Sequence, residues 1–472
     1  MSKKKLIAKL LANLDFQPTE SQKNLIDALA AFIENGFTTE LFLIKGYAGT
    51  GKTTVVNALV RTLQGLKTRS VLLAPTGRAA KVMTSYTHTP AWTIHKKIYR
   101  QKSGSDGMGM FVLDRNMHKN TWFIVDEASM IGQGSMESSF GSGNLLSDLL
   151  QYVQSGEHCR LVLIGDTAQL PPVKLDVSPA LDPPVLESYG FSVHQVTLTD
   201  IVRHQSGSGI LTNATVIRNH ISVSDIAIPR ITAGTHDDLQ LVGGAELLEA
   251  ISDSYDRYGE EESIVVTRSN KRANQFNAGI RGQILWREEQ ISRGDLLMVV
   301  KNNYFWKDID KRIDFIANGD IARIERVIGF EEMYGLRFAN VDLQMTDHEG
   351  VELEAKIMLD VLDVDGPSLP IDSQRNLYMK ILEDYPGLTS KKQRAEQMMK
   401  NEYFNALQVK FAYAVTCHKA QGGQWKAVFL DLGYFKEDMI SIDYLRWLYT
   451  AFTRATDKLY LVNFPEVFLS NH

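Results

Sequence analysis

The sequence is poor in cysteine and has no excess of either charge. Its 472 residues contain two cysteines, Cys159 and Cys417, and two thiols can form neither a disulfide framework nor a zinc cluster. A reducing, cytoplasmic compartment is therefore expected. The 51 basic and 56 acidic residues leave a net charge of −5. This balance excludes a uniformly basic protein that coats nucleic acid, but it is compatible with a local basic channel.

Long apolar runs are also missing. No stretch approaches the roughly 20 apolar residues that a membrane-spanning helix requires, so we expect a soluble protein without a membrane partner. The N-terminus, MSKKKLIAKLLANL, begins like a signal peptide, but Lys9 interrupts its short apolar run and no small-residue cleavage site follows. We predict an amphipathic helix there. Hydrophobic residues make up 44% of the chain and charged residues 23%, which excludes general disorder.

The sequence does contain short apolar runs, each ending in a polar or glycine turn that opens into a helical pattern. Continuously apolar runs of this length are typical of strands covered on both faces of a parallel sheet. In the N-terminal part they are residues 41–44, 71–73, 122–125 and 161–164, and in the C-terminal part 264–266, 428–430 and 459–462. The predicted fold class is α/β, with two doubly wound domains.

Two insertions interrupt this pattern. Residues 287–408 are too many for a structureless connection, and their β-like stretches and polar helical stretch, 372–408, predict an inserted subdomain. Residues 97–120, with a glycine-rich centre, predict a projecting β-hairpin. The Ser/Gly-rich residues 132–144 predict a surface loop. The expected domains are 1–200 with the hairpin, 201–286 together with 409–472, and the inserted 287–408.

The strongest chemical signal is the segment from Gly46 to Thr53, GYAGTGKT, between a predicted strand and a predicted helix. Its glycines let backbone N–H groups surround a β-phosphate, and the helix N-terminus adds positive potential. Lys52 is expected to reach the β- and γ-phosphate oxygens, and the Thr53 hydroxyl to bind Mg²⁺. A glycine turn without a nucleotide is the weaker alternative.

Two further strands end in polar residues. The run TWFIV ends in Asp126 and Glu127, where Asp126 is expected to hold Mg²⁺ and Glu127 to orient or deprotonate the attacking water. Alone, such a pair is usually a solvated turn, but it follows a buried-type strand in a chain with a phosphate loop. The run LVLIG leads to Gln169, which is expected to hydrogen-bond the γ-phosphate. If this segment stood alone, a strand followed by a proline-bounded turn would be the preferred interpretation.

The order of these and other segments resembles the superfamily 1B DNA helicases, specifically the RecD-like, Dda-like branch. The resemblance extends from Thr19 to about Asp457 and departs from the usual pattern at His204 and Ala420, where Gln and Ser are commoner. The segments similar to the family's motifs are TESQK (19–23), APTGRAAK (74–81), TIH (93–95), DEAS (126–129), GDTAQLPPV (165–173), LTDIVRH (198–204), TRSN (267–270), YAVTCHKAQG (413–422) and LYTAFTRA (448–455).

The resemblance implies two RecA-like domains with ATP bound between them. Arg203 and Arg454 are then expected to reach from the second domain to the γ-phosphate, so that hydrolysis depends on domain closure. Without the other motifs, Arg454 would be interpreted as a helix-surface arginine. The other residues expected at the nucleotide are Gln22, which would read adenine, and Gly46, Ala48, Gly49, Thr50, Gly51, Thr54 and Gly422.

The resemblance also implies a track for single-stranded DNA. Short polar side chains beside strand ends suit hydrogen bonds to phosphates and sugars. The sequence leaves two roles open for Trp92, which are stacking on a base and packing in the core. The hairpin 97–120 would be a strand-separating pin with Phe111 as a wedge, or a loop without this role, and 287–408 an SH3-like subdomain with a helical hook. The residues expected to contact the strand are Pro75, Thr76, Arg78, Thr93, His95, Phe111, Thr416 and His418.

The sequence therefore predicts an ATP- and Mg²⁺-dependent DNA helicase that acts as a monomer. Its expected partners are single-stranded DNA and junctions of single- and double-stranded DNA. The 5′-to-3′ polarity follows from the resemblance alone. An RNA helicase or remodeller, and a single-stranded DNA translocase that does not separate strands, stay open as alternatives. An ATP-binding scaffold is disfavoured by the intact Lys52, Glu127, Arg203 and Arg454.

Overall fold

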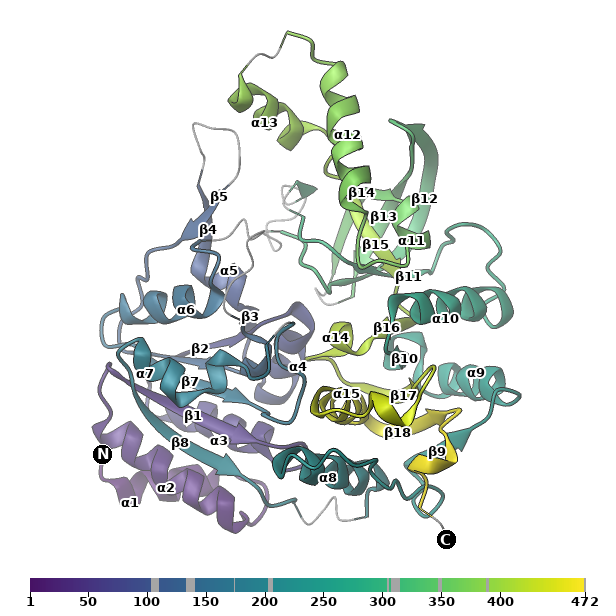
Figure 1. Ribbon diagram of the computed structural model, residues 1–472. Helices are drawn as coiled ribbons and strands as arrows, with labels where there is room; N and C mark the ends of the chain where they lie inside the picture. The colour runs from purple at the N-terminus through teal and green to yellow at the C-terminus, as the bar shows by residue number, and fades with distance from the viewer. Residues whose placement is uncertain are drawn as a thin grey trace.

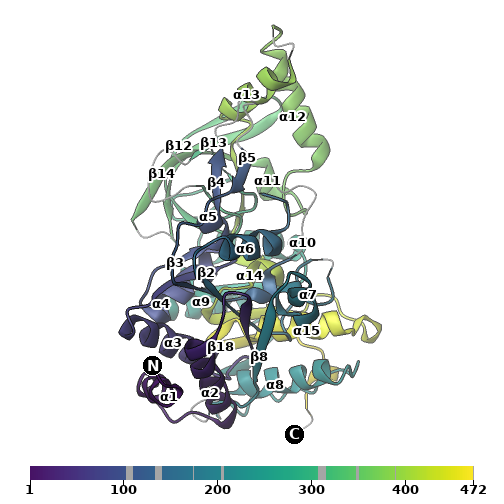
Figure 2. The ribbon, with the colours of Figure 1, turned by 90° about the vertical axis from the view of Figure 1, so that its left-hand side faces the viewer.

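The computed structural model describes residues 1–102, 110–132, 141–173, 175–202, 207–303, 305–306, 315–346, 350–387 and 390–470. Two α/β domains lie side by side, and a β-barrel with two long helices stands beyond them (Figure 1). Both views place the barrel at the end of the molecule opposite α1, α2 and α8 (Figures 1 and 2). Among the described helices, none combines the length and apolarity needed to cross a membrane.

The first domain contains a sheet of parallel strands in the order β3-β2-β6-β7-β1-β8. The four strands predicted from apolar runs are confirmed as β1, β2, β6 and β7, whereas β3 and β8 were not predicted. The strands are β1 (Glu40–Gly46), β2 (Arg69–Ala74), β3 (Ala91–Thr93), β6 (Thr121–Val125), β7 (Arg160–Gly165) and β8 (Ser192–Leu198).

Helices cover both faces of this sheet, as the continuous apolar runs predict. Along β1, Phe42 and Ile44 pack on one face with α1 to α3, and Leu41 and Leu43 on the other with α6. The predicted N-terminal helix is confirmed as α1. The helices are α1 (Lys3–Ala12), α2 (Glu20–Asn35), α3 (Lys52–Gly65), α4 (Gly77–Thr87), α5 (Ile94–Ile98), α6 (Leu145–Gln154) and α7 (Pro183–Ser188).

The second domain also has a parallel sheet, in the order β16-β10-β17-β18-β9. The three predicted strands are confirmed as β10, β17 and β18. The two parallel sheets confirm the predicted α/β fold. The elements are α8 (Gly209–Ser222), β9 (Leu239–Val242), α9 (Leu247–Tyr258), β10 (Ser263–Thr267), α10 (Asn270–Gln283), β16 (Ala414–Thr416), α14 (Cys417–Ala420), β17 (Trp425–Asp431), α15 (Ile442–Phe452) and β18 (Ala455–Val462).

The inserted subdomain is a closed β-barrel that carries the predicted helical stretch. Its last strand continues to Phe411, past the expected limit at residue 408. The elements are β11 (Leu296–Val299), β12 (Ile321–Met333), β13 (Leu336–Met345), β14 (Val351–Met358), α11 (Asp360–Asp363), α12 (Ile371–Glu383), α13 (Lys391–Lys400) and β15 (Leu407–Phe411).

The smaller insertion forms an antiparallel hairpin of β4 (Tyr99–Lys102) and β5 (Met110–Leu113), as predicted. Its tip, residues 103–109, lies outside the described residues, as do residues 133–140 of the predicted surface loop. In Figure 1 the hairpin and α13 rise on the same side of the molecule. The hairpin therefore projects from the first domain toward the inserted subdomain.

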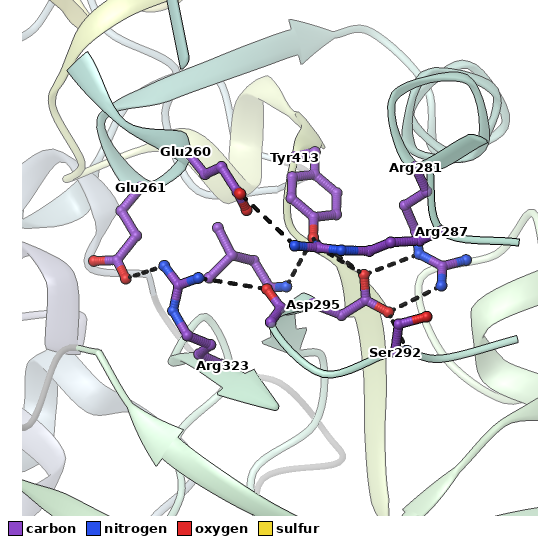
Figure 3. A network of polar contacts seen from close by, with 10 residues as sticks. Glu260, Glu261, Arg281, Arg287, Ser292, Asp295, Arg323 and Tyr413 are labelled. Carbon is purple, nitrogen blue, oxygen red and sulfur yellow. Dashed lines mark hydrogen bonds and ion pairs between the residues drawn. The ribbon is translucent and has the colours of Figure 1, made fainter. Parts of the chain in front are cut away.

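One carboxylate joins the barrel to the second domain (Figure 3). Asp295, fully buried at the start of β11, accepts hydrogen bonds from Arg281 Nε and Nη2 at 3.0 and 2.9 Å. It also accepts bonds from Arg287 Nη1 and the Tyr413 hydroxyl, each at 3.1 Å, and from the Ser292 N–H at 2.7 Å. The chain enters the barrel after Arg287 and leaves it before Tyr413, so both crossings meet at this carboxylate.

We expect Asp295→Asn to destabilise the joint strongly. The substitution removes the charge and leaves the Arg281 guanidinium buried without its counter-ion, and breaking a buried pair costs roughly 3–5 kcal/mol. The thermal unfolding midpoint should fall by several degrees. The control is Asp342→Asn on the same barrel, because Asp342 pairs at 2.7 Å with the exposed Arg326, and an exposed pair contributes only about 0–1 kcal/mol. Equal shifts in both variants would contradict the role of Asp295.

Candidate active site

The loop between β1 and α3 has the geometry of a phosphate cradle. Gly49 and Gly51 have φ angles of +74° and +78°, a region that glycine adopts without strain. A Cβ on Gly51 would also lie 2.4 Å from Gln22 Nε2, so a side chain there would displace the Gln22 amide as well as strain the backbone. The N-terminus of α3 opens onto the loop and provides N–H groups for an anion.

Lys52 lies along this loop. Its ammonium donates hydrogen bonds to the carbonyls of Gly46 and Tyr47 at 2.7 and 2.9 Å and is 3.9 Å from the Asp166 carboxylate. Asp166 follows β7, the neighbour of β1 in the sheet, so the register of two adjacent strands brings the ammonium and the carboxylate together. Thr53 is exposed in the first turn of α3, and Thr54 beside it is half-buried.

Asp126 and Glu127 lie at the end of β6. Asp126 accepts hydrogen bonds from the Glu127 N–H at 2.8 Å and the Tyr86 hydroxyl at 2.7 Å. Glu127 has a φ of +52°, a conformation that costs a non-glycine residue energy and is concentrated at functional sites. Burial raises the pKa of Glu127; Arg454 acts against this, Asp126 raises it further, and Lys52 lowers it. A carboxylate with a raised pKa is a stronger base.

The donor atoms near this edge fit Mg²⁺. The Thr53 hydroxyl and the Asp126 carboxylate are hard oxygen ligands, and Mg²⁺ is usually held by one or two carboxylates together with phosphates and water. The described residues contain no cluster of three or more His, Cys, Asp or Glu side chains that could hold a metal ion by itself. Thr53 and Asp126 would therefore need phosphate oxygens to complete the site.

The second domain contacts this edge through α15. The Thr450 hydroxyl accepts a hydrogen bond from the Leu170 N–H at 2.9 Å, and Gln421 Nε2 donates to the Leu170 carbonyl at 2.7 Å. Arg454 is 3% exposed and donates to the Thr450 carbonyl at 3.0 Å. Its charge acts against the rise in the pKa of Glu127, and its other hydrogen bonds go to the Gly423 carbonyl at 3.1 Å and the Thr453 hydroxyl at 3.2 Å, both in the second domain. Gln169 is buried, and its Oε1 accepts no hydrogen bond within the described part of the chain.

Two residues predicted to contact the nucleotide, Gln22 and Gly422, lie against protein groups. Gln22 Oε1 accepts from the Thr19 N–H and its Nε2 donates to the Thr50 carbonyl, each at 3.0 Å, so the amide braces the phosphate loop and its contact with adenine stays a prediction. A side chain on Gly422 would meet Ala79 and Thr76, in the segment predicted to contact DNA. Arg203 lies outside the described residues.

The predicted DNA-contacting segments of the two domains meet across the interface. Thr76 and Thr93 cap α4 and α5 with hydrogen bonds from the Ala79 and Lys96 N–H groups, both at 3.2 Å. The Arg78 guanidinium lies 4.0 Å from the Trp425 ring centroid. The structure thus brings the segment after β2 against the segment after β16. Pro75 precedes the α4 cap and Thr416 precedes α14, at the ends of these two strands.

The barrel covers this meeting point. The Lys81 ammonium donates to the Thr346 carbonyl at 2.6 Å, and Lys419 contacts Asn318 of the predicted turn 318–320. Asp320, in the same turn, is buried, and one of its carboxylate oxygens would lie 2.6 Å from a Cβ on Gly77. The turn therefore lies over the first residue of α4. The sequence identified this turn but not its position.

The two predicted histidines are electrically neutral near pH 7. Burial lowers the pKa of His95 to about 4 and also lowers the pKa of His418. A neutral imidazole can hydrogen-bond a phosphate or sugar but cannot form an ion pair with it. Trp92 is 43% exposed, with the Lys96 ammonium 5.0 Å from a ring centroid. The core alternative for Trp92 is therefore wrong, and its ring is available for stacking.

The structure does not support Phe111 as a wedge. Its side chain is 6% exposed and packs with Ile94, Ile98 and Tyr99 in the core of the first domain. The Phe315 ring of the inserted subdomain lies 6.4 Å away. Side chains alternate between the two faces of a strand, and position 111 faces inward, whereas a wedge must be exposed.

Sequence reasoning missed Tyr449. This residue lies on α15, but its hydroxyl accepts a hydrogen bond from the Ala48 N–H at 2.8 Å and donates one to Asp166 Oδ2 at 2.7 Å. Its place in the segment LYTAFTRA was visible, but only the arginine of that segment was assigned a role. Nothing in the residue type indicates a contact with a loop 401 positions earlier.

The chain is similar in sequence to known proteins. Residues 18–221 match the family model described as an AAA domain, and residues 411–462 match the UvrD-like helicase C-terminal domain. The ATP-dependent RecD2 DNA helicase of Deinococcus radiodurans is 24% identical over 94% of this chain and 50% of its own length. The chain therefore spans half the length of this relative. The ATP-dependent DNA helicase dda of phage T4 is 25% identical over 65% of this chain and 67% of its own.

Among solved structures, one similar chain is the Pif1 helicase from Bacteroides in complex with ADP-AlF3 and single-stranded DNA. It is 13% identical, with a TM-score of 0.47, over 97% of this chain and 95% of that chain. A second is the Pif1 helicase from Candida albicans, which is 14% identical with a TM-score of 0.44, over 97% of both chains.

We expect His95 to make stability depend on pH. Because its pKa is about 4 in the folded protein and about 6.5 in an unfolded chain, the unfolded state binds more protons between these values. Its stabilising contribution is complete above pH 6.5 and is lost as the pH falls through 4. The fall of the unfolding midpoint from pH 7 to pH 5 should be smaller in His95→Gln than in the unmodified protein.

The control for this measurement is His194→Gln. His194 is 49% exposed on β8 and lies 3.4 Å from the Glu40 carboxylate, so this substitution should not reduce the fall of the midpoint between pH 7 and pH 5. A His95 variant with the same pH dependence as the control would contradict the buried, neutral state of His95.

Proposed function

We propose that this chain is an ATP- and Mg²⁺-dependent DNA helicase of superfamily 1B. It translocates 5′ to 3′ on single-stranded DNA and unwinds duplex DNA. The observation that supports this proposal most directly is the division of the catalytic groups between two domains. Lys52 and Glu127 belong to the first domain and Arg454 to the second, and the charges of Lys52 and Arg454 both act on the pKa of Glu127.

Each group then has a role in phosphoryl transfer. Lys52 and the loop N–H groups bind the β- and γ-phosphates. Thr53 and Asp126 would hold Mg²⁺, which would supply positive charge to the phosphates. Glu127 accepts a proton from the attacking water, and Gln169 orients that water or the γ-phosphate. Arg454, together with Arg203, stabilises the charge that develops on the γ-phosphoryl group.

Hydrolysis is coupled to movement because the arginines approach only when the domains close. The single-stranded DNA runs over the N-termini of α4 and α5 and against α14. Thr76, Thr93 and Thr416 are the N-cap residues of these three helices. Domain closure shifts α4 and α5 relative to α14, and release of the products reverses this shift. A closure cycle of this kind gates turnover in many enzymes.

Translocation on single-stranded DNA without strand separation is the second candidate function. The burial of Phe111, at 6% exposure, favours it because the predicted wedge is not available. Separation would then depend on another exposed group of the hairpin β4–β5 or of the barrel.

The deciding experiment compares two partial duplexes that differ only in a 5′ or a 3′ single-stranded overhang. With ATP and Mg²⁺, we expect opening of the 5′-tailed substrate alone, and ATP hydrolysis that rises when single-stranded DNA is added. Opening of the 3′-tailed substrate would overturn the polarity. DNA-stimulated ATP hydrolysis without opening of either would favour the translocase, and stimulation by RNA alone would favour an RNA remodeller.

Two substitutions test the assigned chemistry. Lys52→Ala should abolish turnover, because the ammonium that binds the phosphates is lost. Glu127→Gln should retain ATP binding but slow hydrolysis by about 10²–10⁴-fold, the usual contribution of a general base. The matched control is Glu187→Gln on the exposed side of α7, which should leave both unchanged. Loss of nucleotide binding in Glu127→Gln would contradict its assignment.

A further inference from the structure

Tyr449 connects the second domain to the phosphate loop of the first. Its hydroxyl accepts from the Ala48 N–H at 2.8 Å and donates to Asp166 Oδ2 at 2.7 Å. The side chain is 1% exposed. Burial and the neighbouring Asp166 raise the pKa of Tyr449 well above its ordinary value, so the hydroxyl keeps its proton and its donor role.

The contact belongs to a larger junction between the second domain and this loop. Asp166 Oδ1 accepts the Ala168 N–H at 2.9 Å, while Oδ2 faces both Tyr449 and the Lys52 ammonium. Tyr47 and Ala48 pack against the second domain's core, and the Arg218 guanidinium of α8 lies 4.5 Å from the Tyr47 ring centroid. The start of the phosphate loop is therefore held from the second domain as well as from its own sheet.

We propose that Tyr449 is a positioning residue that competes with the phosphates of ATP for the Ala48 N–H. The proposal rests on the proposed function, which places Ala48 at the nucleotide. A backbone N–H has one hydrogen, so a phosphate oxygen that accepts it displaces the Tyr449 hydroxyl. Lys52, which turns from the Gly46 and Tyr47 carbonyls to the phosphates, at the same time changes the charge that faces Asp166.

Displacement of Tyr449 moves the helix that leads to Arg454. Arg454 lies two residues beyond the end of α15 and is held by the Thr450 carbonyl at 3.0 Å and the Gly423 carbonyl at 3.1 Å. The arrival of a nucleotide at Ala48 therefore shifts the guanidinium that acts on the γ-phosphoryl group. Through Tyr449, the binding of a nucleotide to the phosphate loop therefore moves part of the second domain before hydrolysis begins.

Tyr449→Phe tests this proposal because it keeps the buried ring and removes only the hydroxyl. Binding of a non-hydrolysable ATP analogue, titrated without DNA, should become about fivefold tighter, since one hydrogen bond of ordinary strength no longer has to be broken. The ratio of DNA-stimulated to basal turnover should fall severalfold, because α15 is no longer tied to the loop. Unchanged or weaker analogue binding would overturn the proposal.

The matched control is Tyr444→Phe on the same helix. Tyr444 is also buried, and its hydroxyl has no hydrogen-bond partner among the described residues, so its removal should leave analogue binding unchanged. Thermal unfolding of both variants separates this effect from a structural role, which would lower the midpoint without tightening the analogue. An equal increase in analogue affinity in Tyr444→Phe would also contradict the proposed competition between Tyr449 and the phosphates.

This comparison is independent of unwinding because it uses the analogue alone. If the unmodified protein binds the analogue but DNA does not stimulate hydrolysis, the proposed function fails, and the affinity of Tyr449→Phe still decides the role of Tyr449. If DNA stimulates hydrolysis normally and the analogue binds no tighter to the variant, the competition fails and the helicase assignment stands.

Discussion

The structure depends on the docking of α15 against the loop that follows β7. In a parallel sheet, the strands end at one edge, and functional groups collect in the loops there. The hydrogen bonds of Thr450 and Gln421 to Leu170 bring together groups from two such edges. Arg454, on the second domain, also acts with its charge on the pKa of Glu127, on the first. The candidate site is therefore divided between the two sheets.

Two residues at this contact, Glu127 and Gln169, have a conformation or an environment that costs free energy. Glu127 has a left-handed backbone conformation, and its pKa is raised by burial despite two nearby cations. Gln169 Oε1 is buried without a partner among the described residues. Such features persist only where the surrounding structure is well packed. Here the strands leading to them, β6 and β7, are buried along almost their whole length, which provides that support.

The sequence was most informative where one physical requirement dominates. Strands covered on both faces must be apolar throughout, so β1, β6 and β7 were recognisable, whereas the half-exposed β8, SVHQVTL, was not. The glycines of the phosphate loop follow from backbone geometry. The contact of Gln22 with Thr50 and the orientations of Phe111 and Tyr449 were not accessible, because each depends on partners distant in the sequence. A glutamine that braces a loop and one that reads a base have the same residue type.

The barrel is supported at two places that belong to different domains. The Asp295 network anchors both of its chain crossings to the second domain (Figure 3), and Lys81 and Phe111 contact it from the first. Both chain crossings lead into the second domain, so the barrel is covalently continuous with that domain and meets the first only through non-covalent contacts. A rotation of the second domain against the first therefore carries the barrel along and changes the separation of the turn 318–320 from α4.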